Sequence, residues 1–468
     1  MGKRGINVLG KLLFIAMVFG VLTPLIAQAG QNADVRIEKL EVQLQAMQAE
    51  LAKLKAEKAA PAVDKKQVES MVDKILTERP RPEMGPSDFR VFWKEGLRFE
   101  TRDKDFKLKL GGRIMNDWAW MRQDSDVKNY TKPQMGEAIG DLEDGTEFRR
   151  VRLYIAGLIY GNVDYKLQFD FAGGKAKLKD AYIGIKDLPF GYLKMGHFKE
   201  PFGLDELTSS KYITFIERAL PMAFAPSRNT GLMLSSTAFD KRMTWAAGIF
   251  RDADSYGKKT SEGGYNVTGR VTALPWYEDK GAKLLHIGAA YSRRSPKNTV
   301  HYRQRPEAHL APYFVDTNSL SADRVGMLGL ESALVYGPFS VQGEYIMTDV
   351  DGKGGSSSPS FDGFYVQSSY FLTGEHRKYS TSKGSFSRVK PKENYKYGAG
   401  LGAWEVAARY SQIDLSDSGI NGGKLKDITA GLNWYLNPNM RIMWNYVRSK
   451  LDGVGNSNLA LMRLQIDF

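Results

Sequence analysis

Hydrophobic and polar residues alternate along much of this chain, which is the pattern of β-strands that have two different faces. In the segment FRRVRLYIAG, which begins at Phe148, Val151 and Leu153 share one face while Arg150 and Arg152 share the other. The segments that follow repeat this arrangement, with apolar rows rich in aromatic residues and opposite rows rich in charges. Lipid on one side of a wall and an aqueous lumen on the other explain both rows.

Sixteen strand-like segments follow each other through the second part of the chain, and most are long enough for a tilted membrane crossing. An even number of strands returns the chain to the side on which it entered the wall. The pattern therefore predicts an all-β fold, a 16-stranded antiparallel transmembrane β-barrel over residues 105–468. The predicted strands lie near 105–121, 147–159, 162–172, 176–187, 190–199, 229–238, 242–252, 263–275, 282–293, 326–336, 339–349, 361–373, 401–413, 424–435, 439–449 and 458–468.

The connections between these strands also favour a membrane barrel. If the N-terminus is periplasmic, the even-numbered connections are mostly tight turns, whereas the odd-numbered connections include the long segments 122–146, 200–228 and 294–325. Short periplasmic turns and long external loops are typical of outer-membrane barrels. One even connection, 374–400, departs from this rule because it is long and basic.

The residues before the barrel predict a leader and a coiled coil. Residues 1–29 have a basic start, an apolar core and an A-x-A site, as in a cleaved signal peptide; the alternative is a permanent membrane anchor. Residues 30–60 predict a short N-terminal coiled-coil helix in the periplasm, or alternatively a lone amphipathic helix, and 61–104 predict a linker with a short helix that leads into the barrel. The apolar seam consists of Ile37, Leu40, Leu44, Met47, Leu51 and Leu54.

Composition excludes several other classes of function. The chain has 468 residues and no cysteine, so it has neither a disulfide framework nor a thiolate metal site. Its five histidines form no metal-spaced pair or nucleophile motif, and we therefore expect no enzyme, metal or cofactor. A barrel hydrolase with a Ser-His site assembled in space is the enzymatic alternative. The net charge of +13 suits nucleic acid, but the leader and the strand pattern argue against that partner.

Arginines are the candidate chemistry of the lumen. Alternation directs Arg150, Arg152 and Arg270 away from the apolar rows, and Arg113 lies opposite an apolar row that contains Trp118. Arginine keeps its charge and offers paired donors to an oxyanion, and several such sites in series let an anion move from one to the next. The alternative is that these arginines brace the wall by pairing with lumen acids. The connection after the ninth predicted strand, 282–293, adds Arg293, Arg294, Arg303 and Arg305 to the candidates.

Several blocks of the chain resemble the phosphate-selective porin O and P family of outer-membrane channels. These blocks are KLGGRIMNDW, FRRVRLYIAG, GHFKEPFGLDELTSSKYITFIERAL and GAWEVAARYSQIDL, and the resemblance runs from about Lys107 to Phe468. It implies trimers of sixteen-stranded barrels with inward-folded loops, an arginine ladder and a lysine cluster. The matching positions are Arg113, Arg149 and Arg150 for the ladder, with Arg149 weaker because alternation places it beside Val151, and Lys211 and Arg228 for the cluster.

The combined prediction is a channel of the bacterial outer membrane, embedded in its lipid, that forms a homotrimer and passes small anions. Phosphate or polyphosphate is the favoured substrate. The alternatives are a weakly selective general porin and a structural or adhesive barrel. The alternation that ends at Phe468 is similar to the C-terminal assembly signal of bacterial outer-membrane proteins.

Overall fold

Sixteen antiparallel strands close into a ring in the computed structural model, which describes residues 89–133, 136–261 and 264–468. Each wall strand pairs with its neighbours in chain order, and the last strand, β21, returns to pair with the first wall strand, β3. The predicted sixteen-stranded barrel is thus confirmed. The predicted signal peptide and coiled coil lie outside the described residues. No helix among those residues is long and apolar enough to span a membrane.

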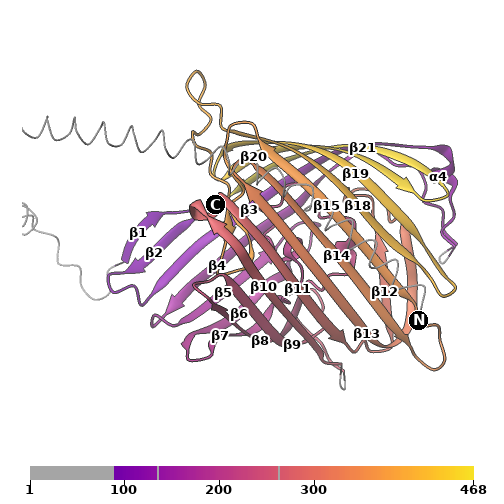
Figure 1. The fold of residues 1–468 in the computed structure, drawn as a ribbon, viewed down its shortest axis with the longest axis horizontal. Helices are drawn as coiled ribbons and strands as arrows, with labels where there is room; N and C mark the ends of the chain where they lie inside the picture. Colours follow the sequence, from indigo (N-terminus) through magenta and orange to yellow (C-terminus); the bar gives the residue numbers. More distant parts are fainter. Residues whose placement is uncertain (1–88, 134–135, 262–263) are drawn as a thin grey trace, which may run out of the picture. The chain divides into compact units, whose positions relative to one another are not determined.

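The wall strands correspond one to one with the segments predicted from alternation, and Figure 1 shows them crossing the barrel obliquely. Such a tilt is required when a sheet closes on itself. The wall consists of β3 (Lys107–Gln123), β4 (Gly145–Ile159), β5 (Val163–Asp170), β6 (Lys177–Leu188), β7 (Gly191–Lys199), β8 (Arg228–Ala238), β9 (Met243–Arg251), β10 (Asn266–Glu278), β11 (Lys283–Arg294), β13 (Val315–Tyr336), β14 (Phe339–Gly352), β15 (Ser360–Phe371), β18 (Ala403–Asp417), β19 (Ile420–Asn437), β20 (Met440–Leu451) and β21 (Gly455–Asp467).

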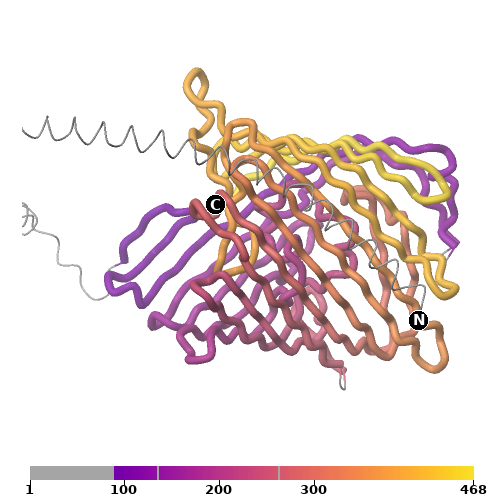
Figure 2. The backbone as a smooth tube through the Cα atoms, viewed as in Figure 1, coloured from indigo at the N-terminus to yellow at the C-terminus, as the bar shows by residue number. Residues whose placement is uncertain are grey.

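The wall is preceded by a β-hairpin, which the alternation of residues did not predict. Strands β1 (Phe89–Trp93) and β2 (Leu97–Thr101) pair with each other, and β2 also pairs with the first residues of β3. Farther along β3, β21 pairs with the same strand from Arg113 onward. The tube in Figure 2 shows this hairpin continuing the sheet past the C-terminus.

Tight turns join the wall strands at one end of the barrel. The β4–β5 turn contains Gly161, whose φ of 71° lies in the left-handed region that glycine adopts without strain. The β13–β14 turn uses Gly337 in the same way, with a φ of 57°. Long connections lie mainly at the opposite end, as the loop pattern predicted. The 3-10 helix η2 (Asp279–Gly281) occupies one short turn, and the helix α4 (Ser125–Asn129) lies in the first long loop.

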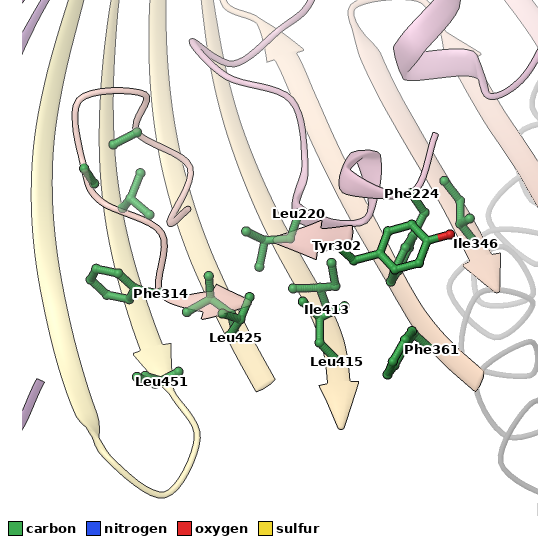
Figure 3. Packing of buried hydrophobic residues seen from close by; sticks show 14 of the residues in the cluster. Leu220, Phe224, Tyr302, Phe314, Ile346, Phe361, Ile413, Leu415, Leu425 and Leu451 are labelled. Carbon is green, nitrogen blue, oxygen red and sulfur yellow. The ribbon is translucent and has the colours of Figure 1, made fainter. Parts of the chain in front are cut away.

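Two long loops fold inward and pack on the inner face of the wall. The β7–β8 loop contains α5 (Leu204–Leu207) and η1 (Leu220–Ala223), and the β11–β13 loop contains β12 (Thr299–Gln304). Figure 3 shows the apolar cluster that holds them, in which loop residues such as Phe224 and Tyr302 meet strand residues such as Ile413 and Leu425. These loops therefore narrow the lumen from the side of the long connections.

A third insert comes from the end with the tight turns. It is the connection 372–402, which contains the short strands β16 (Tyr379–Ser380) and β17 (Ser385–Phe386). Its residues Arg377, Phe386 and Arg388 are buried, and Arg388 forms an ion pair with Asp467 of β21. The one even-numbered connection that is long and basic is therefore partly built into the barrel interior.

Candidate functional site

The two sides of the wall differ as the alternation predicted. On β3 the outward row contains Ile114, Trp118 and Trp120, with 39%, 41% and 46% of each residue exposed. Arg113 and Asp117 of the same strand point inward and are only 6% exposed. Large apolar residues on the outer surface and charges inside are the reverse of the arrangement in a water-soluble protein. This arrangement is that of a barrel with lipid outside and water within.

Two arginines from neighbouring strands face each other in the lumen. Arg113 of β3 and Arg152 of β4 are direct cross-strand partners. The Nε of Arg152 donates to Asp170 at 2.7 Å, whereas Arg113 donates to the hydroxyl of Ser210 at 2.7 Å. Within the described chain the Nε of Arg113 has no hydrogen-bond partner. Like charges directly opposite each other destabilise a sheet, so wall stability does not account for this pair.

A second excess of positive charge lies on β5 and β8. Both Lys166 of β5 and Arg228 of β8 form ion pairs with Asp180 of β6, the latter at 2.8 Å. Two cations thus share one carboxylate. Arg228 was a predicted site residue, whereas Lys166 was not. The alternation of β5 could have indicated that Lys166 faces the lumen, since it places Lys166 on the face opposite Tyr165 and Leu167.

A β-bulge determines where the adjacent arginines of β4 point. Arg149 is the extra residue of an irregular pairing between β3 and β4, with Phe148 and Arg150 on either side of it. Phe148 faces outward and Arg150 inward, although regular alternation would place them together. Arg149 donates twice to Glu217, at 2.8 and 3.0 Å, instead of joining the outward row of Val151. The expectation from alternation therefore fails at Arg149.

Three arginines surround the carboxylate of Glu217. Arg463 donates to it at 2.9 Å, and Arg150 lies 4.0 Å away. Burial raises the pKa of Glu217, but Arg149, Arg150 and Arg463 outweigh burial and hold the pKa well below its usual range. Glu217 is thus an anion that ties the β7–β8 loop to the wall. Arg150 contacts it only at long range, and the Nε of Arg150 has no hydrogen-bond partner among the described residues.

Lys211 projects from the same loop. Its Nζ lies 3.1 Å from the Oδ2 of Asp467 and 5.3 Å from the centre of the Tyr212 ring. Burial lowers the pKa of Lys211 to about 8, although the nearby carboxylate of Asp467 acts in the opposite direction. The charge on Lys211 is therefore sensitive to mildly alkaline pH.

Two candidate arginines are fully occupied by acids. The Nε of Arg270 donates to Glu331 at 3.0 Å, and both residues are buried. Arg294 forms ion pairs with Glu200, at 3.0 Å, and with Asp252. These contacts join wall strands to each other and to the β7–β8 loop. They match the alternative in which a lumen arginine braces the wall.

The remaining arginines of the β11–β13 connection lie in two different places. Arg303 and Arg305 lie over the ring of Tyr313, at 4.1 and 4.3 Å from its centre, and neither has a carboxylate partner within the described ranges. Arg293 is exposed in the outward row of β11 that also contains Tyr291. Arg293 therefore lies away from the lumen, because alternation still governs this end of the strand.

The described residues contain no cluster of three or more histidine, aspartate and glutamate side chains that could hold a metal ion. The chemistry of the lumen is that of fixed positive charges, partly offset by carboxylates.

Comparison with known proteins finds relatives of this chain both in sequence and in structure. Residues 120–468 match the sequence model of the family "Phosphate-selective porin O and P". The chain is 30% identical over 413 residues to Porin O of Pseudomonas aeruginosa, covering 80% of this chain and 89% of that protein. It is also 30% identical over 460 residues to an uncharacterized protein of Caulobacter vibrioides, covering 92% and 88%. Among solved structures, a loop-deletion mutant of OmpT, an outer membrane protein of Vibrio cholerae, aligns with a TM-score of 0.50 at 10% identity, over 78% of this chain and all of that one.

Proposed function

The chain belongs to the phosphate-selective porin O and P family, and on that premise we propose that this outer-membrane barrel passes small anions, preferring phosphate or polyphosphate. The observation that carries the proposal is the facing pair Arg113 and Arg152 in the lumen. A mutually repulsive pair of buried cations is costly to a sheet, but it suits a permeating anion that lies between them. Members of this family are porins, which are channels rather than enzymes.

The attraction at such a site is large enough to select ions by charge. A univalent anion about 4 Å from one cation gains about 4 kcal/mol at a dielectric typical of a protein surface. Water and nearby acids reduce this value, so several moderate sites in series favour passage over trapping. Guanidinium groups also offer paired donors that match two oxygens of phosphate, which chloride lacks. This difference supports a preference for phosphate.

Not every candidate arginine belongs in the proposed path. We place Arg113, Arg150, Arg152, Lys211 and Arg228 along it. Arg113 has no carboxylate partner among the described residues, and Arg150, Lys211 and Arg228 each share one with another cation. Arg152 is included because it lies directly opposite Arg113. Arg303 and Arg305 would attract anions at the β11–β13 loop. Arg270 and Arg294 act as braces, Arg149 positions Glu217, and Arg293 lies outside the path.

The assembly we propose is a homotrimer in outer-membrane lipid, with the N-terminal coiled coil in the periplasm. The apolar seam of residues 30–60 supports the association of chains, and the apolar outward rows of the wall support contact with lipid.

The test is the substitution Arg113→Gln, measured in planar bilayers. The reversal potential in a KCl gradient gives the preference for anions, and block of chloride current by phosphate gives the binding of phosphate. We expect Arg113→Gln to weaken phosphate block about tenfold, the effect of about 1.4 kcal/mol of lost attraction. Arg293→Gln is the matched control, because it removes the same charge from the outward row, and it should leave block unchanged.

Each alternative function gives its own result. A reversal potential near zero, with no phosphate block in the wild-type channel, would identify a general porin. The absence of channel activity in a folded barrel would favour a structural or adhesive role. Equal effects of Arg113→Gln and Arg293→Gln on phosphate block would show that the facing pair in the lumen does not bind phosphate.

A further inference from the structure

A small cavity lies where two of the inserts meet the wall near the C-terminus. Its volume is about 20 Å³, and its lining comes from the β7–β8 loop, the connection 372–402, β20 and β21. Four charged groups line it: Lys211, Arg388, Arg441 and Asp467. Three cations therefore share a cavity with one carboxylate.

Asp467 is the shared counter-ion of two of these cations. Its Oδ2 lies 3.1 Å from Lys211, and its Oδ1 accepts from Arg388 at 3.2 Å in a paired contact. Arg388 also lies near a second carboxylate, with its Nε 3.5 Å from the Oε1 of Glu95. Asp467 is 2% exposed, so its charge acts at short range on the cations around it.

Arg441 has no carboxylate partner in the part of the chain that the structure describes, although it is only 2% exposed. One of its terminal nitrogens donates to the carbonyl of Ile213 at 2.8 Å, and the other donates to Gln465 at 3.1 Å. Its Nε is buried without a hydrogen-bond partner among the described residues. A buried guanidinium with neutral partners and an unused donor is costly, which points to an anionic ligand.

We propose that Lys211, Arg388 and Arg441 form a further anion site of the lumen, in which Asp467 is a built-in counter-ion that a permeating oxyanion displaces. This inference rests on the proposed function and names a residue that sets its affinity. With Asp467 in place, Lys211 and Arg388 are paired and the cavity has room only for water, so an entering anion exchanges with the resident carboxylate. The exchange lowers the net affinity, which allows the anion to leave.

Two substitutions with opposite expected effects test this role. Asp467→Asn keeps the shape of the side chain and removes the competing charge, so inorganic phosphate should block chloride current at about tenfold lower concentration. Arg441→Gln removes a cation from the same cavity and should raise the blocking concentration about tenfold. A general loosening of the barrel does not produce opposite changes. Arg441→Lys, which keeps the charge, should restore part of the wild-type block.

The controls separate this inference from the proposed function. Asp141→Asn removes a carboxylate that pairs with Lys128 in the first long loop, far along the chain from the cavity, and should leave block unchanged. Suppose that phosphate blocks the wild-type channel, but Asp467→Asn and Arg441→Gln either leave block unchanged or shift it in the same direction. The exchange site is then overturned, while the proposed function stands. If the wild type shows neither anion preference nor phosphate block, the proposed function falls and this inference falls with it. Should Asp467→Asn fail to assemble, an Arg441→Gln barrel with unchanged block still overturns the proposal.

Discussion

At the scale of single residues, the lumen contains two kinds of cation. Arg270 and Arg294 are matched by acids and join structural elements, whereas Arg113 and Arg441 lie buried with neutral partners. Lys211 is intermediate, because it has a carboxylate partner but shares that partner with Arg388. An anion is attracted chiefly by the charge that the protein leaves unmatched, so we expect selectivity to depend on the unmatched arginines and on Lys211.

We expect the charge of Lys211 to make anion selectivity dependent on pH. Burial lowers the pKa of Lys211 to about 8, so the group is charged at pH 6 and becomes neutral as the pH rises above 8. We expect the permeability ratio of chloride to potassium to fall between pH 7 and pH 9. Measurements in KCl are suitable, because neither ion titrates in this range. Lys211→Arg should abolish the fall, since arginine keeps its proton, and a wild-type ratio that stays constant to pH 10 would contradict the assignment.

At the scale of elements, apolar packing holds the inward-folded loops in place. Leu220 and Phe224 of the β7–β8 loop are 1% and 3% exposed, and the Phe224 ring meets that of Tyr302 with centres 5.3 Å apart. The packing is local to the inner face of the wall, as Figure 3 shows. The barrel itself is closed by strand pairing, so loosening the loop need not open the wall.

Phe224→Ala therefore tests the loop separately from the barrel. Truncation of a buried phenylalanine costs about 3–5 kcal/mol, here mostly from loop docking. We expect larger single-channel conductance and weaker phosphate block, with the heat-modifiable electrophoretic mobility of the barrel unchanged. Phe190→Ala is the matched control, because Phe190 is 56% exposed in a tight turn. Conductance equal to that of the wild type would show that the loop does not limit the channel.

The wall strands were predictable from sequence because each has one side in lipid and one in water. The hairpin of β1 and β2 escaped prediction, as did β12, which pairs with an extension of β13 that begins at Val315. Alternation is a weak guide there, since Val315 and Leu320 are buried by the packed loop rather than turned to lipid. A strand pattern identifies which face a residue occupies but not its distant partners.

For the candidate site as well, the sequence predicted which face a residue occupies but not which residues it contacts. Alternation placed Arg150 and Arg152 on the lumen face, and the structure adds that Arg152 is paired with Asp170. The position of Arg149 in the bulge could not be inferred, because its partner Glu217 lies far away in the chain. The cavity between Lys211 and Arg441 likewise depends on three segments that meet only in the folded barrel.

At the scale of the whole molecule, the barrel is narrowed by inserts from both ends. The β7–β8 and β11–β13 loops enter from one end, and the connection 372–402 enters from the other. The inserts meet the wall at charged contacts such as Lys211–Asp467 and Arg388–Asp467. A channel limited in this way would keep its selectivity within each barrel, so we expect the proposed assembly of several chains to serve stability and anchoring rather than ion selection.

The last prediction concerns that assembly. The seam of residues 34–58 predicts a parallel three-stranded coiled coil on the periplasmic side, outside the described residues. Fewer than four heptads are marginal alone, so the barrels must hold the chains together. The chain has no cysteine, and Leu44→Cys therefore gives a single crosslinking site in the seam. Treatment of that variant with a trifunctional maleimide, which can join three thiols, should give covalent trimers in the outer membrane. Ala49→Cys, on the outer side of the same heptad pattern, should crosslink poorly, and a ladder that ends at dimers would exclude the three-stranded assembly.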